Sequence, residues 1–192
     1  MSVEIEKRKG VVVLPINKIE GSTLYFFRIP PRVEDKKKKV ESSELLRSAR
    51  GLRVVGGDGL PGGGVEIGQS LLQAAAEEWE QEAGGVEIVG LADRLLPTMV
   101  MNIYQERPQP TDFDVTLFLL YLSEVESQKM AECGASLTML DLLTGELYDA
   151  GDGHVLENIR PAHNDLLYYF AMIAKAYSYR EDSYSYEQAV IA

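Results

Sequence analysis

Residues 56–85 read GGDGLPGGGVEIGQSLLQAAAEEWEQEAGG, a glycine-rich segment followed by a dense run of helix-forming residues. The alanines, glutamines and glutamates that follow Ser70 have high helix propensity, and serine is a favourable N-cap residue. Gly84 and Gly85 end the run, because glycine readily adopts the left-handed conformation that closes helices. The stretch therefore predicts a glycine loop that leads directly into a helix over residues 69–83.

This predicted helix has two distinct faces. At about 100° of rotation per residue, Glu78, Gln81 and Glu82 share one side of it. Two glutamates one turn apart repel each other, and a hard cation such as Mg²⁺ removes that repulsion. The alternative for these glutamates alone is a solvated acidic helix surface. A separate apolar stripe, which we expect to pack on a sheet, consists of Leu72, Ala75, Ala76, Trp79 and Ala83.

The segments on both sides of this stretch alternate between predicted strands and turns. Residues 10–16 and 22–29 are rich in β-branched and aromatic side chains and predict a hairpin. A charged surface excursion at about 31–50 follows, with four consecutive lysines at 36–39 and a short helix near 42–49. The other predicted elements are strands at 52–55, 86–96, 98–104 and 114–123, a loop at 108–110, a short helix within 135–147, a turn at 148–154 and a helix that begins near 161. This order predicts an α/β fold with a mixed central sheet and helices on its faces.

Length and composition indicate the domain organisation and exclude several classes of protein. The 192 residues suit a single domain, with residues 161–192 as a closing helix and a tyrosine-rich tail. This tail, at 177–186, is expected to pack on the domain or at a homodimer contact, with an aromatic substrate platform as the alternative.

The formal net charge of −11 argues against nucleic-acid binding. Cys133 is the only cysteine, and no apolar run is long enough to span a membrane, so we expect a cytoplasmic protein.

Residues 63–85 resemble the Nudix box, G-x5-E-x7-R-E-U-x-E-E-x-G-U, in which U is a bulky apolar residue. With its first glycine at Gly63, the pattern runs without a gap to Gly84, and the preceding segment 60–66 (LPGGGVE) also matches what usually precedes the box. The resemblance implies a Nudix-type α/β/α sandwich. Three box positions depart from the pattern, namely Gln69 for the first glutamate, Glu77 for the arginine and Gln81 for the first member of the Glu-Glu pair, and Gly85 replaces the final apolar residue. Because residues 77 and 81 lie one turn apart, we interpret their changes as a linked replacement.

The resemblance also implies a function, a divalent-metal-dependent hydrolase of nucleoside diphosphate derivatives, with a nucleotide sugar or ADP-ribose slightly favoured. Glu78 and Glu82 would hold Mg²⁺ or Mn²⁺, with a weaker contribution from Gln81, and Gly62 and Gly63 would contact the substrate. A general base is expected among Glu124, Glu126, Asp112 and Asp114, and spacing does not choose between them. For His154 and His163 we expect structural or solvent roles.

Two other functions fit the same sequence. A Nudix-fold protein with impaired turnover could bind a nucleotide or a protein partner. A purely structural domain could dimerise through its C-terminal helix and tyrosines.

Overall fold

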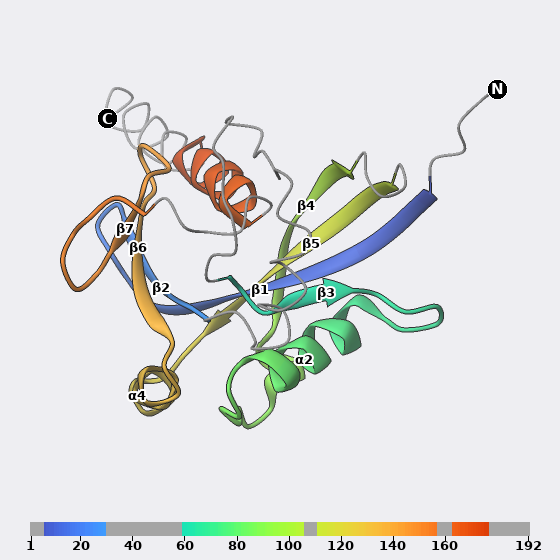
Figure 1. Cartoon of the computed structure of the whole chain (residues 1–192), viewed down its shortest axis with the longest axis horizontal. Helices are drawn as coiled ribbons and strands as arrows, with labels where there is room; N and C mark the ends of the chain where they lie inside the picture. The colour runs from blue at the N-terminus through green and yellow to red at the C-terminus, as the bar shows by residue number, and fades with distance from the viewer. Residues whose placement is uncertain (1–5, 30–58, 106–110, 157–162, 177–192) are drawn as a thin grey trace, which may run out of the picture.

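The structure is a computed structural model, which describes residues 6–29, 59–105, 111–156 and 163–176, without the side chains of residues 104 and 105. These segments form a seven-stranded mixed sheet with helices on both faces (Figure 1). The strands are β1 (Glu6–Glu20), β2 (Thr23–Arg28), β3 (Gly62–Gly64), β4 (Leu96–Gln105), β5 (Thr111–Tyr121), β6 (Ser136–Asp141) and β7 (Leu147–Asp149). The helices are α2 (Leu71–Glu82), α3 (Leu91–Arg94), α4 (Glu124–Glu132) and a last helix described over residues 163–176.

Strand β1 lies at the centre of the sheet. The strand order is β4-β5-β1-β2-β6-β7, and β3 pairs with β1 outside this path. Strand β1 runs parallel to β5 from Glu6 to Ile16, and antiparallel to β2 near its end and to β3 near residues 10–12. Residues 10–16 are buried, which suits a continuous apolar run that is covered on both faces of a sheet.

The two faces of β1 contribute to two separate hydrophobic cores. Val12 and Leu14 pack with Leu166, Leu167 and other residues of one core, beneath the helix of residues 163–176. Val11 and Val13 point the other way and pack with Ala75, Trp79 and further residues from α2, α3 and β5. Figure 1 shows the 163–176 helix on one side of the sheet and α2 and α4 on the other. The predicted fold class, helices on both faces of a mixed sheet, is confirmed.

The predicted capped helix is confirmed as α2. The Ser70 side chain accepts a hydrogen bond from the Gln73 backbone N–H, and the Gln73 side chain accepts one from the Ser70 N–H, which completes a capping box. Ala75, Trp79 and Ala83 of the predicted apolar stripe are buried and Ala76 is partly buried, while Ala74, which the stripe did not include, is buried as well. Leu72, which the predicted stripe includes, is 38% exposed instead, because the buried side of α2 is displaced toward Ala74.

Several predicted elements are wrong. The strand predicted over 86–96 is not formed: residues 86–95 are an irregular segment and the short helix α3, since Gly90 at φ 67° starts a turn in the middle of the run, and Leu96 is the first residue of β4. Residues 135–147 hold strand β6 rather than a helix, and the helix at this point in the chain is α4, which follows Ser123. Strand β7 begins at Leu147, extends into the predicted turn at 148–154 and pairs with β6. Gly62–Gly64, predicted as part of a turn, forms strand β3.

Other predictions lie outside the described residues. They comprise the lysines at 36–39, the helix near 42–49, the strand at 52–55, the loop at 108–110 and the tyrosine-rich tail. Among the helices of the described segments, none combines the length and the apolar composition that a bilayer span requires.

Candidate functional site

The glycine strand β3 connects the loop-helix segment to the sheet. Its antiparallel register with β1 pairs Gly62 with Val12 and Gly64 with Gly10. Two further backbone hydrogen bonds flank this pairing. The Val13 N–H donates to the Pro61 carbonyl (2.8 Å), and the Val65 N–H donates to the Lys9 carbonyl (2.9 Å). Since backbone groups alternate in direction along a strand, the N–H groups of Gly62 and Gly64 point away from β1. This edge of the strand faces the end of α2 that carries the glutamates.

Glu82 binds the backbone of β3 at this edge. The Gly62 N–H donates a hydrogen bond of 2.9 Å to Glu82 Oε2. The Glu82 side chain is half-buried, so this charge-assisted bond holds its carboxylate in one orientation against the strand. The bond engages a single carboxylate oxygen, Oε2.

Glu78 lies against the same strand, one turn earlier on α2. A Cβ placed on Gly63 would overlap with Glu78 Oε1 and lie only 2.6 Å from the carboxyl carbon, far inside van der Waals contact. The glycine at position 63 therefore makes room for the Glu78 carboxylate. The structure thus brings together four predicted site residues, Gly62, Gly63, Glu78 and Glu82, at one short strand.

The loop before α2 is tied to the helix by Gln69. The Gln69 side chain accepts a hydrogen bond from the Glu66 N–H (3.0 Å) and donates one from Nε2 to Glu77 Oε2 (2.8 Å). A glutamate at position 69 could not donate to Glu77 and would repel it. Glu77 therefore has a hydrogen-bonding partner in the loop, at Gln69. Gln81 is exposed on the helix surface.

The two carboxylates suit a metal ion that is bound by the protein and by the phosphates of a substrate together. No group of three or more His, Cys, Asp or Glu side chains suited to hold a metal occurs in the segments that the structure describes. Mg²⁺ does not require such a group, because it is usually held by one or two carboxylates together with water and substrate phosphates. Glu78 and Glu82 supply two carboxylates from one helix, and both residues are partly exposed to solvent.

One of the four proposed general bases is committed to another role. Arg94 donates to Glu126 through Nη1 (2.7 Å) and Nη2 (2.9 Å), and also to the Tyr121 carbonyl. The hydrogen bond from Arg94 is the main reason why the pKa of Glu126 falls to about 2. Glu126 also caps α4 by accepting from the Ser123 N–H. Because its oxygens are bonded and its pKa is low, this carboxylate is a poor proton acceptor at neutral pH.

The other three candidates lie in different places. Glu124 is exposed in the first turn of α4. Asp112 and Asp114 lie at the start of β5, on the sheet face that α2 also covers, since Phe118 and Leu120 of the same parity pack in the α2 core. Asp114 accepts a hydrogen bond from the Asn102 side chain, at 3.0 Å. The choice of base among these three stays open.

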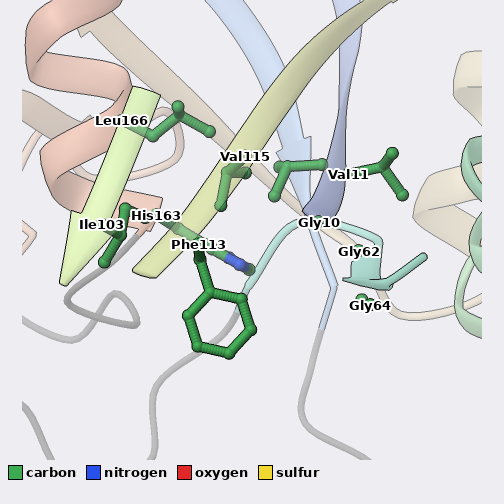
Figure 2. A pocket seen from close by; sticks show the side chains of 11 residues that line it. Gly10, Val11, Gly62, Gly64, Ile103, Phe113, Val115, His163 and Leu166 are labelled. Carbon is green, nitrogen blue, oxygen red and sulfur yellow. The ribbon is translucent and has the colours of Figure 1, made fainter. Parts of the chain in front are cut away.

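A pocket of about 240 Å³ lies on the opposite face of the sheet (Figure 2). Its walls are Ile103 of β4, Phe113 and Val115 of β5, and His163 and Leu166 of the last helix. Its floor is backbone, made by Gly10 of β1 together with all three glycines of β3. Strand β3 therefore has the glutamates of α2 on one side and this pocket on the other.

His163 joins the pocket wall to the chain just before β3. The buried imidazole accepts a hydrogen bond of 2.9 Å at Nδ1 from the Leu60 N–H. Acceptance at Nδ1 requires the neutral ring with its proton on Nε2. The hydrogen bond to Leu60 agrees with the structural role that we expect for His163. Its position in the wall of the pocket was not predicted. No spacing in the sequence indicates it, since Leu60 is 103 residues away.

Comparison with known proteins finds remote likenesses of fold. No family model and no curated protein sequence matches the chain. Over 91% of its length the chain resembles the crystal structure of a MutT/nudix family protein from Enterococcus faecalis, with 12% identity and a TM-score of 0.49, and it spans 65% of that protein. It resembles a mutT/nudix family protein from Listeria innocua at 17% identity and a TM-score of 0.45, covering 91% of this chain and 98% of that one.

A third solved structure, the Ap4A hydrolase of C. elegans, is similar over 61% of this chain and 70% of its own, at 16% identity and a TM-score of 0.34.

Proposed function

We propose that this chain is a divalent-metal-dependent pyrophosphohydrolase of nucleoside diphosphate derivatives, with residues 63–85 as its Nudix-type site. One observation carries the proposal: the two glutamates that the box resemblance selects both contact β3. Glu82 accepts from the Gly62 N–H, and Glu78 occupies the space that a side chain at Gly63 would fill. A solvated acidic helix needs neither contact, so this geometry favours a built site over a plain helix surface.

The metal would be Mg²⁺ or Mn²⁺, held by Glu78 and Glu82. When bound, such an ion supplies charge neutralisation for the diphosphate and acidifies a water molecule. The chain itself fixes the two carboxylates against a strand, so that little reorganisation is needed when a ligand arrives. A bound cation also explains how a chain with a net charge of −11 would accept a polyanionic substrate.

A binding protein with impaired turnover is the second candidate, and the departures from the box favour it. Gln81 provides no negative charge, and Glu77 is bonded to Gln69. The site then has two carboxylates on α2 where the family pattern has a third at position 81. Fewer charged ligands weaken cation binding and the chemistry that depends on it.

One experiment separates the two functions. Nucleoside diphosphate derivatives, including a nucleotide sugar and ADP-ribose, are incubated with the full chain and Mg²⁺ or Mn²⁺, and release of nucleoside monophosphate is measured. Turnover that disappears in Glu82→Gln supports the hydrolase. A rise in melting temperature with nucleotide and metal but without turnover supports the binding protein, particularly if Gln81→Glu with Glu77→Arg creates turnover. The proposal fails if the chain neither turns over nor binds any of these compounds.

A further inference from the structure

We infer that His163 is a positioning residue for the Glu82 carboxylate, on which it acts through the backbone of residues 60–62. The inference rests on the proposed function and adds to it a residue of the last helix, on the opposite face of the sheet from the two glutamates. Three observations support it: the two hydrogen bonds that hold this backbone, the stiffness of the backbone between them, and the fixed position of the imidazole.

Side chains from the two faces of the sheet bind the same short piece of backbone. On one face, the Leu60 N–H donates to His163 Nδ1 at 2.9 Å. On the other face, the Gly62 N–H donates to Oε2 of Glu82, the last residue of α2, also at 2.9 Å. Figure 2 shows His163 extending from the last helix toward the chain that leads into β3. Only Pro61 separates the two residues that donate these bonds.

The backbone between the two bonds is stiff. Proline fixes its own φ and also restricts the residue before it, which is Leu60. A Cβ at Gly62 would lie 2.6 Å from the Val11 carbonyl oxygen, so the backbone of Gly62 is packed closely against β1. A change in the direction of the Leu60 N–H is therefore passed on to Gly62, because no flexible residue lies between them.

The bonds to neighbouring strands do not fix the tilt of this backbone. Gly59 pairs with Ile29 through bonds of 2.8 and 2.9 Å, and the Pro61 carbonyl accepts from the Val13 N–H at 2.8 Å. Bonds of this kind lie in the plane of a sheet, so they allow the chain to tilt out of that plane. The bond from Leu60 to His163 leaves the plane and opposes such a tilt.

The last helix keeps the imidazole in a fixed position. His163 is buried, and its helix packs on the sheet through Leu166 and Leu167. At the other end of the helix, Lys175 Nζ donates to the Leu143 carbonyl at 2.9 Å. The acceptor atom Nδ1 is therefore carried by an element that is attached to the fold at both ends.

The orientation of Glu82 is the property that this arrangement controls. Groups that hydrogen-bond a metal ligand set its direction, and removing such a group commonly weakens metal binding by about 10-fold to 100-fold. The Gly62 N–H is such a group for Glu82, and His163 fixes the backbone that carries it. This role requires no contact between His163 and the metal. We expect an effect at the lower end of that range, because His163 acts through two residues.

Three variants separate positioning from stability. His163→Phe keeps a ring and removes the acceptor. His163→Asn supplies an amide oxygen that is separated from Cβ by the same number of bonds as Nδ1, so it can accept from the Leu60 N–H. Ala171→Gly is the control, because it weakens the same helix at a buried position and leaves residue 163 unchanged.

The first measurement is Mn²⁺ binding to the full chain without substrate, followed by electron paramagnetic resonance of the free ion. The Kd should rise about tenfold in His163→Phe and return toward the wild-type value in His163→Asn. Ala171→Gly should keep the wild-type Kd. Equal Kd values in wild type and His163→Phe, or a His163→Asn variant that binds no more tightly than His163→Phe, would overturn the inference. Wild type would still bind the ion, so the proposed function would stand.

A second measurement needs no metal and applies even if wild type binds no Mn²⁺, in which case the proposed function is lost. Hydrogen exchange of the Gly62 N–H is followed by NMR, and the N–H of the buried Leu117 in β5 reports on opening of the whole fold. His163→Phe should accelerate exchange at Gly62 more than at Leu117, and His163→Asn should reverse this. Acceleration at Leu117 that equals or exceeds that at Gly62 would show that His163 only stabilises the fold, which overturns the inference.

Discussion

The Gln69 side chain donates a hydrogen bond of 2.8 Å to the Glu77 carboxylate and so joins the loop after β3 to the first half of α2. The Nudix pattern has a glutamate and an arginine at these two positions, which form an ion pair of opposite charges when they meet. In this chain one member is a neutral amide and the other is an anion. In this chain the loop and the helix are joined by a charge-assisted hydrogen bond rather than by an ion pair.

Gln69→Glu should therefore destabilise the chain. The new carboxylate faces Glu77 and cannot donate to it, so we expect the free energy of unfolding to fall by about 1 kcal/mol in low salt. Urea denaturation at pH 7 measures this loss, which should shrink in roughly 1 M salt as the repulsion is screened. The double variant Gln69→Glu with Glu77→Arg should recover stability. A double variant that is no more stable than Gln69→Glu would show that residues 69 and 77 are not coupled.

Gly63→Ala should reduce turnover while the fold is retained. The new methyl group would overlap with Glu78 Oε1, and the flexible end of the glutamate is the part that can move. A displacement of about 1 Å at a reacting site can cost about a hundredfold in rate. Steady-state kinetics and thermal melting together check this prediction. Adding Glu78→Asp, whose shorter side chain leaves room for the methyl group, should recover part of the rate. Full activity in Gly63→Ala would place Glu78 outside the site.

Glu82→Gln should lower turnover by at least about tenfold, because the charge is lost while the amide oxygen of the new side chain can still accept from the Gly62 N–H. The melting temperature should change little for the same reason. The matched control is Glu80→Gln, which removes the same charge from an exposed position on the same helix. Equal activity losses in the two variants would indicate a general charge effect rather than a role for Glu82.

Glu126→Gln should remove a pH-dependent part of the stability. The folded pKa of about 2 lies below the ordinary value of a glutamate, so Glu126 stabilises the fold above about pH 4.3, and the contribution is lost as the pH falls toward 2. Glutamine retains the capping box, which isolates the charge. At pH 7 we expect a loss of about 1 kcal/mol, since a third of the Arg94 side chain is exposed to screening solvent.

Urea denaturation between pH 7 and pH 3 would show this difference becoming smaller as the pH falls. Glu124→Gln, in the same helical turn, is the control and should change stability little at either pH. A difference for Glu126→Gln that stays constant with pH would contradict the ion-pair assignment.

His163→Phe should destabilise the fold by about 1–3 kcal/mol, because the buried Leu60 N–H loses its acceptor while a ring remains in place. The exposed His154 provides a control, and His154→Phe should leave the unfolding free energy almost unchanged. Chemical denaturation of the two variants gives the comparison. Equal stabilities would mean that the bond between Leu60 and His163 contributes nothing.

The local part of the site could be predicted from the sequence. The helix α2, its Ser70 cap and the shared face of Glu78 and Glu82 all follow from residues within one segment of the chain. The contacts of those glutamates could not be predicted, because they depend on the β3–β1 pairing, which brings Gly62 next to Val12. The position of Gln69 between Glu66 and Glu77 likewise requires the folded loop.

The elements after the box show where local patterns mislead. The local pattern favours a short helix within 135–147, although Thr138 and Leu140 of this range are buried at alternate positions, as in a strand. The signal for α4 was present in the sequence: Ser123 and Glu126 form a capping box, and both were available as a start signal. The pocket had no such signal, since its lining comes from β1, β3, β4, β5 and the last helix. A pocket lined by segments that are distant in the sequence can be recognised only once the chain is folded.

The parallel pairing of β1 with β5 has a consequence for synthesis on the ribosome. Ile16 finds its partner only at Tyr121, so the central strand leaves the exit tunnel long before its neighbour exists. Until then, the valines at 11–13 can pair only on the side of β3, and they lack the strand that lies along their other edge. Such late, non-local pairing slows folding and leaves an unpaired strand edge exposed to other chains. The interval between the synthesis of β1 and that of β5 is therefore a period in which the unpaired central strand is open to aggregation.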